Sequence, residues 1–493
     1  MNNHSLTAHW DALPFDALRS LQLQRLRDFL QHKVIPHNEH YREKFAAAGF
    51  APAQLRCLED LARLPFTNKE DLLVNPRDFL LVPDQAALKR QAGVVLRALL
   101  LGRRRVQKQL EREFRPVLLT STTGRSARPV PFFYTGHDIA NLELSGRRMM
   151  EVCQSRQDFR HLNLFPFAPH LAFWLAHYAG TGFGTFCLST GGGKVMGTAA
   201  SIAIIDKIQP DALIGMPTFI HHVLTQALEE KRRWTQISRI VLGGEKVPPG
   251  LRRKLRALCA ELGSPGVEVM ATYGFTEAKT AWPECPSGSS EPTGYHLYPD
   301  MGIVEVVHPE TGNPVDPGHS GEIVYTSLDS RGSVVLRYRT GDLIEGGLVH
   351  EPCPACGRTC PRLVGNIGRV SNVQHIRLDK IKGTLVDLNK LEHLLDDLDA
   401  VGAWQIEISK RNEDPMEPDQ LVIHASLTAA ASPEFARSSI LRRFLEETEI
   451  RPNEIVFHSS EDMQERHGVG RNLKEIKILD RRMEAERPVP VVT

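Results

Sequence analysis

The stretch LTSTTGRS, residues 119–126, begins with the last residue of the apolar run 117–119, and we expect a short strand that runs into a flexible loop. Four hydroxyl side chains and a glycine occupy five consecutive positions: Thr120, Ser121, Thr122, Thr123 and Gly124. Backbone N–H groups in such a loop converge on an anion, and hydroxyls add donors. It is not a Walker loop, because G-x-x-x-x-G-K-[ST] is absent. An ordinary loop has the same composition, so this pattern needs support elsewhere.

Three further motifs give that support, in a fixed order along the chain. ATYGFTE, residues 271–277, follows a strand-like segment at 267–270, and YRTGDL, residues 338–343, follows another at 333–336. GRV, residues 368–370, comes next, and NLKEI, residues 472–476, lies close to the C-terminus.

This ordered set resembles the adenylate-forming superfamily, which includes acyl-CoA synthetases, peptide-synthetase adenylation domains and luciferases. Within it, the N-terminal run LEDLARLPFTNKEDL, residues 58–72, is similar to the phenylacetate-CoA ligase family. The resemblance covers nearly the whole chain and is weakest between residues 75 and 115 and toward the C-terminus.

The fold class that we predict is α/β. Strand and helix patterns alternate between residues 117 and 345, which favours a parallel sheet. The segments 303–307 and 321–326 indicate a β-rich subdomain. With the resemblance, this predicts an adenylate-forming N-terminal domain, residues 1–367, with parallel-sheet subdomains and a β-rich subdomain. Residues 368–493 are expected to form a small, mobile α+β domain that carries the catalytic lysine.

Composition narrows the class of protein. The chain of 493 residues is long enough for two or more domains, and 41% hydrophobic and 24% charged residues are typical of a globular protein. A formal charge of +1 gives no reason to expect nucleic acid as a partner. No apolar run reaches the roughly 20 residues of a membrane span. With eight cysteines and no apolar leader, we expect a cytoplasmic enzyme with reduced thiols.

The resemblance implies a first reaction in which a carboxylate joins the α-phosphate of ATP and pyrophosphate leaves. The hydroxyl-rich loop would hold the phosphates, and Glu277 would bind Mg²⁺, which prefers carboxylate ligands. Thr276 would contact the α-phosphate, and Asp342 would accept the ribose hydroxyls. Lys474 would neutralise the developing negative charge. Lys474, Thr276 and Glu277 are thus the catalytic candidates.

The remaining nucleotide-binding candidates come from three segments. Tyr273 is expected to flank the adenine, and the turn after residues 240–242 to lie beside it. The set, besides the phosphate loop and Asp342, is Gly243, Gly244, Glu245, Ala271, Thr272, Tyr273, Gly274 and Arg369.

Two departures from the family pattern bear on activity. Ser121 stands where the phosphate loop usually has glycine, and Arg125 or Arg128 would replace the charge of a lysine. The expected interdomain hinge begins at Gly368, but Ser371 and Asn372 replace two aspartates. Asn tolerates unusual backbone angles, so a hinge is still expected.

A cysteine-rich segment predicts a metal centre. Cys353, Cys356 and Cys360 lie within eight residues, with a glycine after the C-x-x-C pair, and Cys285 lies upstream. Four thiolates would form a closed, structural zinc site, with His296 as an alternative ligand. Buried free thiols and a redox pair are the other interpretations.

Aromatic residues suggest the pocket for the acyl group. The resemblance points to Phe167, Phe173, Gly215 and Pro217, and an aromatic lining favours an aryl or aliphatic acid over a charged one. Aromatic clusters are also common in ordinary cores.

Residues 86–114 form a basic stretch interspersed with apolar residues. A membrane-surface helix is one interpretation. We favour a core-packed helix with a solvated basic face, inserted relative to the family.

Together these features predict an AMP-forming acyl- or aryl-CoA ligase that uses ATP, Mg²⁺ and CoA and holds structural Zn²⁺. Its partners are a small-molecule carboxylic acid and ATP, and a homodimer is left open. One alternative is an adenylating enzyme that passes its acyl group to a carrier protein or an amine. Another is a nucleotide-binding relative without catalysis, against which the retained Glu277, Asp342 and Lys474 argue.

Overall fold

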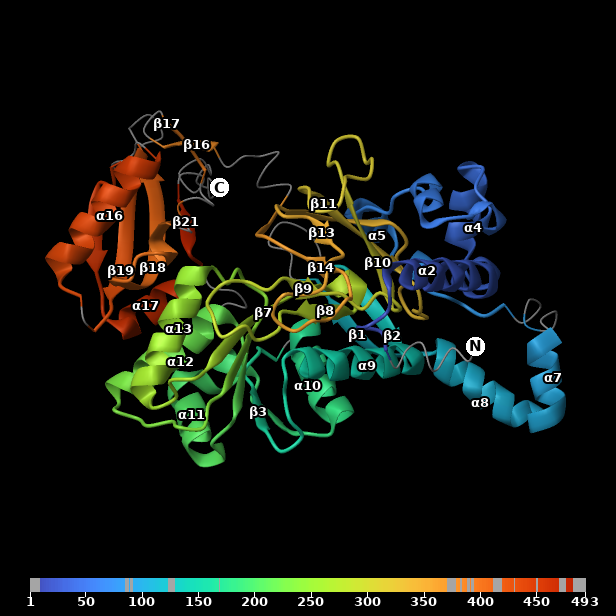
Figure 1. Ribbon diagram of the computed structural model, residues 1–493, viewed down its shortest axis with the longest axis horizontal. Coiled ribbons are helices and arrows are strands. Elements are labelled where there is room, and N and C mark those ends of the chain that lie inside the picture. The colour runs from blue at the N-terminus through green and yellow to red at the C-terminus, as the bar shows by residue number, and fades with distance from the viewer. Residues whose placement is uncertain are drawn as a thin grey trace, which may run out of the picture.

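The computed structural model describes residues 9–84, 88, 92–122, 129–167, 169–369, 378–381, 384–387, 391, 394–410, 419–429, 431–448, 451–469 and 476–481. Within these residues the apolar side chains form two separate cores. The larger core draws on residues 10–363, and the smaller one on residues 391–455. In Figure 1 the C-terminal elements form a body of their own that packs against α12 and α13.

A six-stranded sheet forms the centre of the large part, with the order β4-β3-β5-β6-β7-β8. Its parallel strands are β3 (Arg160–Asn163), β4 (Phe186–Ser189), β5 (Ala212–Gly215), β6 (Arg239–Leu242) and β7 (Glu268–Phe275), and β8 (Thr280–Pro283) is antiparallel at the edge. The helices are α9 (Gly136–Val152), α10 (Leu171–Phe183), α11 (Gly192–Ile208), α12 (Pro217–Glu229) and α13 (Pro249–Leu262). The predicted parallel α/β architecture is confirmed. Because β5 is buried along its whole length, its sequence is a continuous apolar run.

The predicted β-rich subdomain is also present. A four-stranded antiparallel sheet has the order β10-β11-β12-β15 and consists of β10 (Gly302–Val307), β11 (Gly321–Ser327), β12 (Tyr338–Ile344) and β15 (Ile367–Arg369). Beside it lies a small sheet of β13 (Leu348–Val349), β14 (Arg362–Leu363) and β9 (Tyr295–His296). A separate hairpin pairs β1 (Pro116–Ser121) with β2 (Pro131–Thr135). The strand expected at residues 333–336 begins only at Tyr338.

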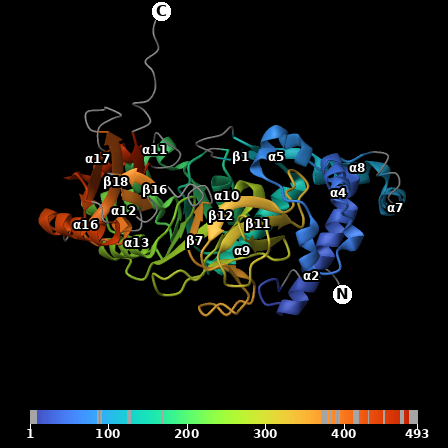
Figure 2. The same ribbon diagram turned by 90° about the horizontal axis from the view of Figure 1, so that it is seen from above.

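Short helices from the N-terminal segment pack against the β-rich subdomain (Figures 1 and 2). They are α2 (Phe15–Phe29), the π-helical Leu30–Val34, α3 (Ile35–His37), α4 (Glu39–Ala47) and α5 (Lys69–Val74), with 3-10 helices at Pro52–Gln54, Leu58–Arg63 and Pro76–Phe79. The buried Tyr41 hydroxyl donates to the Val334 carbonyl at 3.0 Å, and this contact anchors α4 to the segment before β12.

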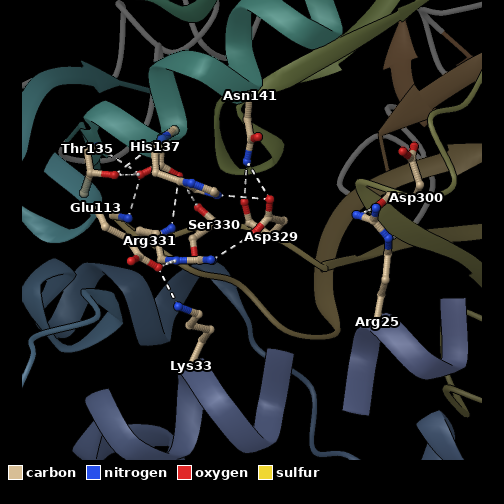
Figure 3. A network of polar contacts seen from close by, with 12 residues as sticks. Arg25, Lys33, Glu113, Thr135, His137, Asn141, Asp300, Asp329, Ser330 and Arg331 are labelled. Atoms are coloured by element: carbon tan, nitrogen blue, oxygen red, sulfur yellow. Dashed lines mark hydrogen bonds and ion pairs between the residues drawn. The ribbon is translucent and has the colours of Figure 1, made fainter. Parts of the chain in front are cut away.

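A polar network joins these N-terminal helices to α9 and the loop 329–332 (Figure 3). Glu113 accepts from Lys33 at 2.6 Å and from Arg331 at 2.8 Å. Arg331 also donates to Asp329, which lies 3.0 Å from His137. Burial alone would raise the pKa of Glu113, but the two cations outweigh it and lower the pKa to about 2. The carboxylate therefore stays charged and holds three segments together.

The basic stretch meets our expectation of a core-packed helix with a solvated basic face in its second helix but not in its first. It forms two helices, α7 (Ala92–Leu101) and α8 (Arg103–Phe114). Helix α8 buries Val106 and Phe114, whereas α7 has no buried residue. Figures 1 and 2 show α7 at the outer edge of the molecule. No helix among the described residues combines the length and the apolar character needed to cross a bilayer.

The C-terminal part has the predicted α+β composition. Its mixed sheet has the order β20-β19-β18-β21, from β18 (Val401–Lys410), β19 (Asp419–Leu427), β20 (Glu454–Phe457) and β21 (Ile478–Asp480). The described helices are α16 (Pro433–Thr448) and α17 (Ser460–His467), and β16 (Leu378–Ile381) pairs with β17 (Thr384–Asp387). The domain boundary at 367/368 stays a prediction.

Histidines meet where α17 contacts α12. His467 Nε2 lies 2.8 Å from the Trp404 carbonyl, so it carries the proton and donates. His467 Nδ1 then accepts from His222 Nε2 at 3.2 Å. Burial lowers the pKa of His222 well below its usual value and that of His221 to about 3. The nearby charged groups are Lys254, Lys477 and Asp396.

This interface should make stability depend on pH. Folding lowers the pKa of such a histidine below its unfolded value, near 6.5. Its contribution to the free energy of unfolding is complete above pH 6.5 and is lost as the pH falls toward the pKa of the folded state. Below pH 6.5 we expect the free energy of unfolding to fall by about 1.4 kcal/mol per pH unit for each such histidine. Urea unfolding between pH 8 and pH 5.5 measures it. His222→Gln should reduce the slope, and the exposed His319→Gln should not; equal slopes in all three proteins would contradict the assignment.

Candidate functional site

Strand β12 connects the two central motifs. The Tyr273 hydroxyl, on β7, donates to Asp342 Oδ2 on β12 at 2.8 Å. The Tyr338 hydroxyl, also on β12, donates to Glu277 Oε1 at 2.7 Å. Both contacts join β12 to β7 or to the turn that follows it. The structure thereby brings together Glu277, Asp342 and Tyr273. The sequence analysis gave Tyr338 no role, although its place at the start of YRTGDL marks it.

A turn between β7 and β8 carries Thr276 and Glu277. It is a 3-10 turn, Thr276–Ala278, that ends at Lys279 with a positive φ of 56°. The Lys279 ammonium is buried and lies 3.1 Å from Asp138 Oδ1. This ion pair fixes the turn that presents Glu277.

Asp138 is the centre of a group of donors. Its Oδ1 accepts from Lys279 Nζ, from the Ser330 hydroxyl at 2.6 Å and from the Arg331 amide at 3.1 Å. Its Oδ2 accepts from the amide and hydroxyl of Thr135 at 2.9 and 3.0 Å and from the Gly332 amide at 2.7 Å. Burial opposes ionisation, but Lys279 and these donors lower the pKa of Asp138 to about 2. The sequence analysis did not single out Asp138, because all of its partners except Thr135 lie far away along the chain.

The turn after β6 lies at the carboxyl end of the parallel strands, where ligands bind in open α/β sheets. A Cβ at Gly243 would lie 2.5 Å from the Thr272 hydroxyl oxygen, so only glycine fits there. Gly244 has a φ of 83°. Glu245 Oε2 accepts from the Thr218 hydroxyl at 2.6 Å and from its amide at 3.2 Å, and so caps the start of α12.

Gly215 and Pro217 lie beside this turn. The Gly243 amide donates to the Gly215 carbonyl at 3.2 Å, and Pro217 opens α12. Strand β7, which pairs with β6, is held at the Ala271 amide, which donates to Glu284 at 2.7 Å. Gly274 lies against Ala281 on β8 too closely for a Cβ, at 2.5 Å.

The structure describes the phosphate loop only as far as Thr122. Thr120 is fully buried, and its hydroxyl contacts the Tyr134 hydroxyl at 3.3 Å, which supports the strand instead of facing a ligand. Thr122 accepts from the Val130 amide at 3.1 Å. Ser121 is partly exposed, and its carbonyl lies 3.2 Å from His170 Nδ1. Thr123 and Gly124 lie outside the described residues.

The aromatic candidates form one cluster next to that loop. The ring centroids of Phe167 and Phe173 are 5.1 Å apart at an interplanar angle of 81°, and Trp174 lies 5.4 Å from Phe173. Phe173 is buried, whereas Phe167 is 59% exposed. The cluster joins the phosphate loop through Pro169, whose carbonyl accepts from the Ser121 amide.

Several predicted residues remain untested. Lys474, Ser371 and Asn372 lie outside the described residues. The Arg369 backbone pairs with Asp342 between β15 and β12. Lys477, the lysine close to Lys474 in sequence, lies 3.3 Å from Asp396 and 4.7 Å from the Trp404 ring centre.

Four potential metal ligands converge: Cys285, His296, Cys353 and Cys356. Their ligand atoms all lie within 4.8 Å of one another. The two sulfurs of Cys285 and Cys353 are 3.7 Å apart, and Cys356 Sγ lies 3.3 Å from His296 Nε2. Zinc–sulfur bonds of about 2.3 Å in a tetrahedron give a sulfur–sulfur edge of about 3.8 Å, so the spacing fits a closed site.

Contacts around this cluster favour ligation. His296 Nδ1 lies 3.2 Å from the Pro283 carbonyl, which orients the ring and leaves Nε2 toward the sulfurs. The Cys353 carbonyl accepts from the Gly357 amide at 2.8 Å within a tight turn. The hydrogen bond with Cys285 lowers the pKa of the Cys356 thiol to about 2, and that same contact raises the pKa of Cys285.

The assignment of Cys360 as a ligand is wrong in this structure. It does not belong to the cluster, and burial in the main core raises the pKa of its thiol to about 12. His296, the predicted alternative, is the residue whose side chain lies with Cys285, Cys353 and Cys356.

Comparisons with known proteins agree with this arrangement. The family model described as "AMP-binding enzyme" matches residues 139–329. The chain is 27% identical to a phenylacetate-coenzyme A ligase of Pseudomonas putida over 66% of each chain, and 26% identical to that of Escherichia coli K12 over 80% of each.

Among solved structures, 2-hydroxyisobutyryl-CoA ligase with 2-HIB-AMP in the postadenylation state superposes with a TM-score of 0.75 and 21% identity. The alignment covers 97% of this chain and 92% of that one. The same ligase in the thioesterification state gives 0.62, with 96% and 91% covered.

The chain thus contains a segment that matches the AMP-binding enzyme model and is similar to phenylacetate-CoA ligases over 66–80% of its length. It shares its fold with the solved 2-hydroxyisobutyryl-CoA ligase.

Replacement of Asp138 by Asn should destabilise the large domain. The change leaves the buried Lys279 without its counter-ion, and removal of one partner of a buried pair costs about 3–5 kcal/mol. The measurement is the free energy of unfolding in urea at pH 7. The matched control is Asp158→Asn, which breaks an exposed pair with Arg156 and should leave the midpoint unchanged. A midpoint for Asp138→Asn equal to that of wild type would refute the central role of this carboxylate.

Proposed function

We propose that the protein is an AMP-forming ligase that activates an aryl or aliphatic carboxylic acid with ATP and transfers the acyl group to CoA. The observation that carries this proposal is the shared anchoring of Glu277 and Asp342 by β12. Two carboxylates with separate proposed tasks, binding of Mg²⁺ and of ribose, are each held by a tyrosine hydroxyl across the contact of β12 with β7 and the turn that follows β7.

Each residue has a defined task in the proposed first step. Glu277 would hold Mg²⁺, which when bound supplies charge neutralisation at the phosphates. Asp342, oriented by Tyr273, would accept hydrogen bonds from ribose hydroxyls. Ser121, Thr122, Thr123 and Gly124 would donate to phosphate oxygens, and Thr276 would contact the α-phosphate.

Lys474 is the proposed cation for the charge that develops between the carboxylate and the α-phosphate. Lys477 is a poor candidate, because its ammonium already pairs with Asp396 and faces Trp404 within the small domain. The contacts of Lys477 therefore support the choice of Lys474 as the catalytic lysine.

The acyl group is proposed to lie against Phe167 and Phe173. An aromatic surface next to the phosphate loop suits an uncharged aryl or alkyl group. The phenylacetate ligases among the relatives make phenylacetate the first acid to test. The second step would need movement of the small domain about a hinge at Gly368.

Carboxylate-dependent exchange of labelled pyrophosphate into ATP tests the first step. We expect exchange with an arylacetic or aliphatic acid and no exchange with amino acids. Lys474→Ala should lower the rate by at least about 100-fold, because removal of one group that stabilises transition-state charge has that effect. Lys477→Ala should retain most of the rate.

The outcomes separate the alternatives. Exchange followed by formation of an acyl-CoA thioester supports the proposed ligase. Exchange without thioester formation assigns the acyl group to a carrier protein or an amine. Binding of ATP without exchange across the whole panel of acids would show a catalytically silent relative.

We also propose that Cys285, His296, Cys353 and Cys356 bind one structural Zn²⁺. Three thiolates and an imidazole form a closed tetrahedral set with no position for a substrate. The site would fix the loop that leads from β13 to β14 and on to β15, the strand that pairs with Asp342.

Metal analysis of the purified protein should find one zinc per chain. Cys356→Ser should lose the metal and lower the melting temperature, because structural zinc contributes folding energy. Cys360→Ser is the matched control: it removes a nearby buried thiol and should keep the zinc. Loss of zinc in Cys360→Ser, with retention in Cys356→Ser, would reverse our assignment.

A further inference from the structure

Helix α7 presents apolar side chains that the described structure does not cover. Leu99 is 78% exposed, Leu100 is 73% exposed and Leu96 is 57% exposed. Val95 and Leu101 are exposed as well. The sequence of the helix, AGVVLRALLL, has a single charged residue, Arg97. An isolated exposed leucine is ordinary, but this concentration in ten residues marks an interaction surface.

The apolar side chains surround most of α7 instead of forming one stripe. At about 100° per residue, Val95 and Leu99 share one side, Leu96 and Leu100 the next, and Leu101 lies beyond them. A protein groove covers one stripe of a helix. Hydrocarbon can cover an apolar helix from several sides, so the distribution favours lipid over a folded partner.

Positive charge lies next to this apolar helix. The exposed basic residues of the hairpin are Arg97, Arg103, Arg104, Arg105, Lys108 and Arg112. Of the two acidic residues of α8, Glu111 is exposed, and Glu113 is engaged with Lys33 and Arg331. Apolar side chains flanked by arginine and lysine match a bilayer with anionic headgroups.

The hairpin holds α7 in position for such contact. Val106 and Phe114 of α8 are buried, and Leu110 packs against the main core, so α8 is a fixed arm. Gly102, with a φ of 85°, forms the bend between the helices. Ten residues of helix are about 15 Å long, half of the roughly 30 Å hydrocarbon core. The helix is therefore suited to the boundary between headgroups and acyl chains.

We propose that α7 docks this protein on the surface of an anionic lipid bilayer. Leu96, Leu99 and Leu100 enter the acyl region, and the arginines at 103–105 contact lipid phosphates. The proposal is independent of the acid that the enzyme uses.

Co-sedimentation with vesicles tests it. The full-length protein is mixed with vesicles of phosphatidylcholine and phosphatidylglycerol, or of phosphatidylcholine alone, at low and high salt. We expect binding to the anionic vesicles that salt weakens. Burial of one leucine corresponds to at least about a tenfold change in partitioning. The triple variant Leu96→Gln, Leu99→Gln, Leu100→Gln should therefore bind at least about 100-fold more weakly.

Two further variants separate charge from apolar insertion. Arg103→Gln, Arg104→Gln, Arg105→Gln should weaken binding to anionic vesicles by about fivefold per residue and leave the weak binding to neutral vesicles unchanged. The control Phe435→Gln, Leu445→Gln removes two similarly exposed side chains, at 62% and 59%, from α16 and should bind like wild type. Circular dichroism and pyrophosphate exchange of each variant exclude misfolding as the cause.

Insertion can be observed directly with Leu99→Trp. The emission of the introduced tryptophan, taken as the difference from wild type, should shift to shorter wavelength with anionic vesicles only. Absence of binding by wild type, or equal binding by the leucine variant, would overturn the proposal. A dimer in solution that the leucine variant converts to a monomer, without vesicle binding, would instead show that α7 is a subunit interface.

Discussion

The buried carboxylate of Asp138 determines how the parts of the site meet. It accepts six hydrogen bonds from three segments: the start of α9, the turn that carries Lys279, and the loop 330–332. Glu277 lies two residues before Lys279, and β12 begins six residues after Gly332. One ionised group thus fixes both segments that the Tyr338–Glu277 hydrogen bond then joins. The cost of burying a charge is offset here, because every neighbour of the carboxylate is a donor.

The sequence was informative where structure is local. The alternation of strands and helices predicted the parallel sheet. Motif order indicated which carboxylates belong to the site. The hydrogen-bond partners of those carboxylates could not be predicted from the sequence, because Tyr338 and Glu277 are 61 residues apart in the chain. The strand expected at 333–336 was misplaced because tertiary contacts, including Tyr41 with Val334, compete with strand pairing there.

The metal ligands show the same limit. Three cysteines within eight residues suggested that all three bind metal, but side-chain direction depends on strand pairing between distant segments. The His296 ring faces the sulfur of Cys356, whereas Cys360 lies outside the group of converging ligand atoms. The prediction that α7 packs in the core was wrong for another reason. Its apolar composition indicates that it is covered, but composition alone does not distinguish a cover of protein from a cover of lipid.

The contact between the small domain and α12 lies far from helix α7, the proposed membrane contact (Figure 1). The small domain rests on α12, whose first turn is capped by Glu245 of the proposed adenine turn, so domain position and nucleotide site share one helix. Figure 1 places α7 at the opposite end of the molecule from α16 and α17. A surface attached through α7 would hold the large domain, because α8 is fixed to the main core. The proposed movement of the small domain would then leave the large domain, and with it the contact with the surface, in place.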